Sequence, residues 1–180
     1  MDALRTLEFP AGSFDLVNQR MGWSYLRTWD WPNLLQEYRR VTRSGGVIRI
    51  SESAAFGETN SPGLKQLCEI GRDAFFHAGH LFKEGPQGLT DELADIMHQQ
   101  GIQNVQTHKV LMQHGKGSAV ETAAKENVKL AFRTMLPFLQ KWTQVPKNYD
   151  QIYQQTLEEM ERPDHVVEWE MVTVWGTNPQ

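Results

Sequence analysis

The sequence has little cysteine, no long apolar run and no basic block. Its single cysteine, Cys68, cannot form a disulfide within the 180-residue chain, which is typical of a reducing, cytoplasmic setting. Because no apolar run approaches ~20 residues, we expect neither a membrane span nor a signal peptide. The 18 basic and 22 acidic residues give a net charge of −4. Nucleic acid and acidic membranes are therefore disfavoured as main partners.

The remaining composition is that of an ordinary globular protein. Hydrophobic residues make up 39% of the chain and charged residues 22%, which excludes wholesale disorder. A chain of this length fits one domain and can bury about 70% of its unfolded surface. Composition therefore predicts a single folded domain but indicates no chemistry, so information about function must come from the order of the elements.

Strand and helix patterns alternate along the chain. Residues 14–20 read as a strand, a helix with Pro32 in its first turn follows, and Ser44-Gly45-Gly46 is expected to end that helix before a strand over 47–51. This order predicts a βαβ unit with parallel strands. Further patterns predict helices over 64–81, 90–101 (with Thr90 as N-cap), 119–142 (broken near Pro137) and 149–161, and strands over 104–112 and 166–175.

The whole order, β-α-β-α-α-β-α-α-β, predicts an α/β layered sheet. The last strand, over 166–175, alternates apolar and polar residues, which favours an antiparallel strand at the edge of the sheet. A glycine pair at Gly115 and Gly117 follows a strand, but it lacks the third glycine of a dinucleotide-binding loop and is interpreted as a turn.

Two stretches resemble a known family. Residues 2–17, which include Asp2-Ala3 and Gly12-Ser13-Phe14-Asp15-Leu16-Val17, and residues 34–48, which end in Ser44-Gly45-Gly46-Val47-Ile48, resemble class I S-adenosylmethionine-dependent methyltransferases. The C-terminal residues 172–176 are similar to the family's closing hairpin strand. The resemblance implies a partial Rossmann-like methyltransferase sheet with helical cap insertions and a C-terminal antiparallel strand.

The resemblance also implies a function and a domain layout. It predicts methyl transfer from S-adenosylmethionine to a small-molecule acceptor. It also predicts one partial domain with three parts: a cofactor- and substrate-side βαβ unit over 1–52, a helical lid over 53–103, and C-terminal strands with a helical insertion over 104–180. The family's glycine-rich loop would precede Asp2, so the domain is expected to be truncated. We therefore expect the isolated chain to bind the cofactor weakly or not at all, because three or four lost charge-assisted hydrogen bonds cost on the order of 5–10 kcal/mol.

The resemblance assigns candidate site residues to the ends of the strands. The expected cofactor-binding residues are Asp2, Ala3, Asn18, Gln19, Arg20 and Met21, and the expected substrate residues are Trp23, Tyr25, Ser51, Glu52 and Phe76. The placement of residues 18–21 has independent support, because ligands of open α/β sheets bind at the carboxyl ends of the strands.

The sequence assigns no catalytic residue. Tyr25, His77 and His80 are candidates for a catalytic role. The two histidines are spaced i, i+3 on a predicted helix, but no third ligand is evident, so no metal site is predicted. Packing is the alternative role for Tyr25 and for both histidines. Methyl transfer itself is an in-line displacement that requires neither a metal nor a covalent intermediate.

Three alternatives differ in function. The leading one is the C-terminal portion of a small-molecule methyltransferase, and the second is a non-catalytic methyltransferase-like interaction module. A short-chain dehydrogenase is the third, but it requires Tyr-x-x-x-Lys, and no tyrosine has a lysine four residues later. In the family, the strand that corresponds to Phe14–Gln19 lies beside the first strand of the sheet, which is missing here. The unpaired edge of Phe14–Gln19 is therefore expected to pair with another chain, as in a homo-oligomer.

Overall fold

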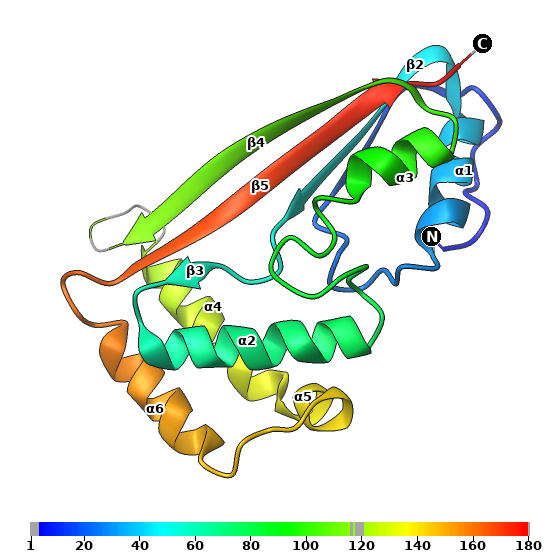
Figure 1. Cartoon of the computed structure of the whole chain (residues 1–180). Coiled ribbons are helices and arrows are strands. Elements are labelled where there is room, and N and C mark those ends of the chain that lie inside the picture. The colour runs from blue at the N-terminus through cyan, green and yellow to red at the C-terminus, as the bar shows by residue number, and fades with distance from the viewer. Residues whose placement is uncertain (1–3, 116, 118–120, 180) are drawn as a thin grey trace.

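The computed structural model describes residues 4–115, 117 and 121–179. Asp2 and Ala3, two of the expected cofactor residues, lie outside the described residues. The elements in chain order are β1 (Phe14–Arg20), α1 (Trp31–Val41), β2 (Thr42–Ser53), β3 (Glu58–Thr59), α2 (Pro62–His77), α3 (Leu93–Gln99), β4 (Gln103–Gly115), α4 (Glu121–Thr134), α5 (Leu136–Trp142), α6 (Tyr149–Glu159) and β5 (Val166–Thr177) (Figure 1).

The strands form one mixed sheet. β1 and β2 pair in parallel, and β5 pairs antiparallel with β2, β3 and β4. The predicted α/β class and the C-terminal antiparallel strand are therefore confirmed. The expected edge position of that strand is wrong, because β5 lies between β2 and β4 along most of its length (Figure 1). Its alternating pattern arises because only one of its two faces is buried.

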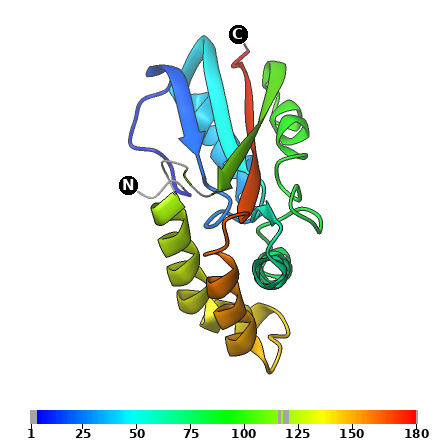
Figure 2. The ribbon, with the colours of Figure 1, turned by 90° about the vertical axis from the view of Figure 1, so that its left-hand side faces the viewer.

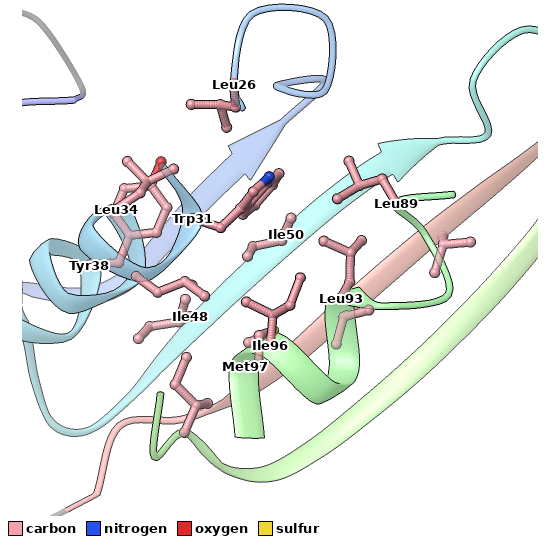
Figure 3. Close-up of a cluster of buried hydrophobic side chains, with 14 of the residues drawn as sticks. Leu26, Trp31, Leu34, Tyr38, Ile48, Ile50, Leu89, Leu93, Ile96 and Met97 are labelled. Carbon is pink, nitrogen blue, oxygen red and sulfur yellow. The ribbon is translucent and has the colours of Figure 1, made fainter. Parts of the chain in front are cut away.

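Helices α1 and α3 cover the same face of the sheet. Leu34 and Tyr38 of α1 and Leu93 and Met97 of α3 meet over the strand that carries Ile48 and Ile50 (Figure 3). Pro32 lies in the first turn of α1, as predicted. This packed layer holds β2 and sets where its carboxyl end lies.

The glycine pair between α1 and β2 does not end the helix. α1 ends at Val41, and Gly45 and Gly46 lie within β2. Gly45 has φ +71°, and a Cβ on Gly46 would lie 2.7 Å from Cγ2 of Thr42. The pair is therefore required for the tight entry into β2, next to β1, rather than for a helix cap.

The remaining helices form a second packed group. α2 packs with α5 and α6 around Leu64, Leu67, Leu139 and Ile152, and the group lies below the sheet in Figure 2. The segment 53–103 thus divides between two groups, with α2 in one and α3 in the other. The proposed three-part domain layout remains a prediction.

The end of α2 and the start of α3 differ from the sequence-based bounds. α2 ends at His77, so the predicted extension of this helix to residue 81 is wrong. α3 begins at Leu93, and Thr90 is not its N-cap. The predicted break near Pro137 is confirmed: the 119–142 stretch divides into α4 and α5, because Pro137 cannot continue an α-helix. Within the described ranges, no helix is long and apolar enough to cross a membrane.

Candidate functional site

The carboxyl ends of the parallel strands β1 and β2 lie side by side. Arg20 is paired with Ser51, and the N–H of Met21 donates to the carbonyl of Ser51 at 2.9 Å. The chain then turns away from the sheet into the loop over 21–30. In open α/β sheets, the ligand site lies at this edge. The predicted residues 18–21, 51 and 52 therefore belong to one edge of the sheet.

The centre of this edge is a buried carboxylate. Glu52 is fully buried and accepts hydrogen bonds from Nε2 of Gln19 (2.9 Å), the N–H of Gly22 (2.8 Å) and the N–H of Trp23 (3.1 Å). Oε1 of Gln19 in turn accepts from the Tyr38 hydroxyl at 2.9 Å. The network ties the loop to both strands and to helix α1.

Burial determines the charge behaviour of this network. It raises the pKa of Glu52, while the hydrogen bonds from Gly22, Trp23 and Gln19 oppose that shift. Burial also raises the pKa of Tyr38 and Tyr25, and the nearby Glu52 carboxylate adds to both shifts. Both tyrosines therefore keep their protons at neutral pH and can act as hydrogen-bond donors.

The backbone of the loop leaves no room at Gly22. A Cβ there would lie 2.3 Å from Nε2 of Gln19 and 2.8 Å from Cδ1 of Leu26. The preceding residue, Met21, has φ 57°, which is uncommon for a residue with a side chain. The Glu52 carboxylate thus holds a tight, left-handed turn immediately after β1.

The structure separates the four described cofactor candidates. Gln19 is buried within the network, whereas Asn18 and Arg20 lie on the opposite face of the sheet, because side chains alternate along a strand. Met21 is 43% exposed at the turn. Of these four residues, Gln19 is the one whose side chain donates a hydrogen bond to Glu52.

The substrate candidates also differ in placement. Tyr25 is 56% exposed, whereas Trp23 packs against Phe56 and Phe75, with ring centroids 5.7 and 4.9 Å away. Ser51 is buried, and its hydroxyl lies 2.9 Å from Oγ1 of Thr173. Phe76 is partly buried against the main core. Tyr25 is thus the described substrate candidate with the most accessible side chain.

The two histidine candidates lie in different environments. His80 follows α2 rather than sharing its last turn, so the expected i, i+3 arrangement of both histidines on one helix is wrong. His80 is 3% exposed, and its Nδ1 donates to the carbonyls of Leu26 (2.7 Å) and Trp23 (3.1 Å). Burial lowers its pKa, so a neutral imidazole ties the loop to the end of α2.

His77 is exposed and lies 3.3 Å from Asp73, one turn earlier on α2. It belongs to the surface of the helical group, and His80 to the loop over the sheet edge. Among the residues that the structure describes, no group of three His, Cys, Asp or Glu side chains could hold a metal ion.

Two participants in the network were not predicted. In the sequence Tyr38 follows Leu34 and Leu35 at helical spacing, which indicates packing, but a buried tyrosine hydroxyl usually requires a partner. Gly22 follows the end of β1, where a glycine often marks a tight turn. These two signals were present in the sequence, but their partners could be identified only from the fold.

The mixed sheet with helices packed against it, and the loop at the carboxyl ends of its parallel strands, define a Rossmann-like α/β fold. Residues 1–50 match the model of a methyltransferase domain family, which confirms the resemblance over that segment. No curated protein sequence matches the chain.

Two solved structures are similar to this chain, and the first of them shares its fold. A candidate methyltransferase from Bacillus halodurans C-125 is 14% identical, with a TM-score of 0.54, and the match covers 100% of this chain and 76% of that protein. Phosphoethanolamine N-methyltransferase 2 from Haemonchus contortus, in complex with phosphomonomethylethanolamine and S-adenosylhomocysteine, is 19% identical, with a TM-score of 0.43, over 99% of this chain. This chain spans only 36% of that relative's length.

Proposed function

We propose that this chain takes part in S-adenosylmethionine-dependent methyl transfer to a small-molecule acceptor, as part of a complete methyltransferase domain. One observation carries the proposal: the Glu52 network shapes a loop at the carboxyl ends of two parallel strands. β1, and β2 as far as Ile50, fall within the segment that matches the methyltransferase domain family.

The residues present fit one side of a cofactor site. Met21 and Tyr25 are exposed on the loop and are proposed to line the site beside the methyl group and the acceptor. Glu52 is unsuited to binding ribose hydroxyls directly, because it is fully buried and already accepts three hydrogen bonds. It is proposed to act as a positioning residue for the loop.

The bound cofactor would supply a methyl group on a positively charged sulfur. The chain's own contribution is then orientation, which can lower a barrier by about 7–11 kcal/mol. A general base adds roughly 10²–10⁴-fold, and only when the acceptor holds a proton. The protonated Tyr25 hydroxyl is proposed to orient the acceptor by donating a hydrogen bond.

The experiment is a titration of this chain, labelled with methyl-¹³C methionine, with S-adenosylmethionine. We expect millimolar or weaker binding that shifts the Met21 methyl resonance, assigned with a Met21→Leu variant. Met112 is the matched control, because it is 38% exposed on β4, away from the loop. A shift of the Met112 methyl resonance as large as that of Met21, or larger, would contradict the proposal.

The second candidate function, a non-catalytic interaction module, is favoured by the edge of β1. Among the described strands, only β2 pairs with β1, and Leu16 is 51% exposed. Pairing through Phe14–Gln19 would produce a homo-oligomer that light scattering detects. A monomer at high concentration that still shows the Met21 shift would favour the enzyme.

A further inference from the structure

The sheet ends at β4 on the side away from β1. Among the described strands, β4 pairs only with β5, so the other edge of β4 has no strand beside it (Figure 1). No backbone hydrogen bond joins residues 104–115 to a described helix or loop. The strand that the complete domain is proposed to add would lie beside β1, at the opposite end of the sheet. It would therefore leave the edge of β4 unchanged.

The edge of β4 has little that would prevent it from pairing with another strand. Edge strands of soluble proteins are commonly protected by prolines, free lysines or bulges. β4 has no proline, and its one lysine, Lys109, is bound to Asp91 (3.3 Å) and Glu170 (3.2 Å) of its own chain. The register shift of the strand lies at its start, between Gln103 and Gln106. Beyond that shift the edge is regular, and no free lysine protects it.

Three consecutive apolar residues form the centre of this edge. Val110 is 44% exposed, Leu111 is 66% exposed and Met112 is 38% exposed. Because side chains alternate along a strand, Val110 and Met112 lie on one face of the sheet and Leu111 lies on the other. The apolar surface therefore follows the edge itself and is not confined to one face. An exposed apolar edge of this kind is suited to pairing with a further strand.

We propose that β4 pairs antiparallel with β4 of a second copy of this chain, centred on Leu111, so that the two sheets become continuous. The two-fold axis places Leu111 opposite Leu111 of the second copy, and Val110 opposite Met112 of the second copy. Each apolar residue of the centre thus meets an apolar residue across the interface. The proposal does not depend on methyl transfer.

The register follows from which residues would lie opposite each other. Opposite residues must lie on the same face, so a two-fold axis can be centred only on a residue. A register centred one residue earlier places Lys109 opposite Leu111, and one centred one residue later places Leu111 opposite Gln113. Of the three registers centred within the apolar segment, the one centred on Leu111 is therefore the one that pairs all three apolar residues with one another.

The polar residues on either side of the centre are compatible with a second copy. In this register Lys109 lies opposite Gln113, so the two lysines do not meet, and His108 lies opposite His114. β4 contains no Asp or Glu, so no carboxylates are brought together. The edge therefore offers no excess of charge that would select an acidic or basic partner strand, whereas its apolar centre is complementary to itself.

The first test compares the edges of β4 and β1 by analytical ultracentrifugation. We expect the wild-type chain to form a dimer. Leu111→Lys places two ammonium groups opposite each other at the centre, and it should raise the dissociation constant at least tenfold. Leu16→Lys is the matched control, because Leu16 is 51% exposed on β1, and it should leave the dissociation constant unchanged. Circular dichroism shows whether both variants fold.

The second test measures the register by disulfide formation with a thiol oxidant. Opposite Cα atoms of antiparallel strands are about 4.5–5.5 Å apart, so the two cysteines of Leu111→Cys can form a disulfide. Val110→Cys is the matched control, because its two copies are displaced along the strands, with Cα atoms about 8 Å apart. We expect Leu111→Cys to form the covalent dimer at least tenfold faster. The wild-type chain gives the background from Cys68, which is buried.

The outcomes separate this edge from the other one. A dimer that Leu111→Lys dissociates and Leu16→Lys does not, together with the faster disulfide of Leu111→Cys, would support the proposal. A wild-type chain that stays monomeric up to millimolar concentration would overturn it. Equal loss of the dimer in both lysine variants, or loss in Leu16→Lys alone, would also overturn it, as would faster disulfide formation by Val110→Cys. The disulfide test decides the matter if Leu111→Lys does not fold.

Discussion

Two buried glutamates in different regions perform similar tasks but differ in the sign of their pKa shifts. Glu52, in the sheet layer, accepts from a side chain, Gln19, and from the N–H of Gly22. Glu159, in the helical group, accepts from the Ser61 hydroxyl (2.5 Å) and from the N–H of Gly63 (2.9 Å). Each carboxylate thus accepts a hydrogen bond from the backbone N–H of a glycine, at the start of the loop for Glu52 and in the first turn of α2 for Glu159.

The pKa shifts have opposite signs because the surroundings differ. Burial dominates at Glu52 and raises its pKa. Burial also opposes ionisation of Glu159, but hydrogen bonds from Ser61, Gln155 and Gly63 outweigh it and lower the pKa. Glu159 lies at the first turn of α2, where helix N–H groups favour a negative charge. Glu52 has three good hydrogen bonds but lies in a drier site. The number of hydrogen bonds alone therefore does not determine how readily a buried carboxyl group ionises.

The largest expected effect comes from Glu52→Ala. It leaves Nε2 of Gln19 and the N–H groups of Gly22 and Trp23 without an acceptor, at about 1–3 kcal/mol each. We expect the free energy of unfolding in urea to fall by about 3–6 kcal/mol. Glu52→Gln is the control and should be milder, because a neutral group suits this site. A loss below about 1 kcal/mol would mean that the network does not hold the loop.

Glu159→Ala should have the next largest effect, a loss of about 2–4 kcal/mol in the same measurement. Two buried donors, the Ser61 hydroxyl and the N–H of Gly63, lose their acceptor, and so does the part-buried Nε2 of Gln155. The glutamine variants should rank in the other order. Glu159→Gln removes a charge that the α2 N-terminus favours, so it should cost more than Glu52→Gln. The reverse ranking of the glutamine pair would contradict the assigned pKa directions.

Gly22 and Gly63, whose N–H groups donate to the two carboxylates, leave no room for a side chain. Gly22→Ala places a Cβ 2.3 Å from the Gln19 amide nitrogen, and Gly63→Ala places one 2.8 Å from Oγ1 of Thr156. Overpacking of this kind costs about 1–3 kcal/mol. We expect thermal unfolding to show both losses, but only Gly22→Ala should abolish the Met21 resonance shift on cofactor addition. If the Met21 resonance still shifted in the Gly22→Ala variant, the conformation of the loop would not be required for cofactor binding.

The smallest effect is the dependence of stability on pH. The lowered pKa of Glu159 gives stability that is present above its unfolded pKa of 4.5 and is lost as the pH falls through the folded value. The raised pKa of Glu52 acts oppositely, so its ionisation costs stability as the pH rises above 4.5.

We therefore expect Glu159→Gln to flatten the acid side of the curve of stability against pH. In the wild-type chain, protonation of Glu52 raises the free energy of unfolding as the pH falls towards 4.5, and Glu52→Gln should remove this increase. Each slope is at most about 1.4 kcal/mol per pH unit, because one proton is involved. Urea unfolding across the acidic range measures both. Identical curves for the two variants would contradict the opposite signs.

Much of the fold could be predicted from local patterns. β1 was predicted with the bounds 14–20, and the break at Pro137 separates α4 from α5 as expected. Local signals failed where the glycine pair and Thr90 resembled caps. Gly45 and Gly46 lie inside β2, and Thr90 precedes α3 by three residues with a buried hydroxyl that has no partner among the described residues. A residue that is able to cap a helix does so only where the packing of the chain begins or ends the helix at that residue.

The candidate site divides in the same way. Periodicity and strand ends in the sequence predict the α/β class, the parallel β1–β2 pair and the edge where Gln19 and Glu52 both occur. The burial of Glu52, its link to Tyr38 through Gln19, and the position of β5 inside the sheet are seen only in the folded structure. These features depend on contacts between residues far apart in the chain, and no local pattern records such contacts.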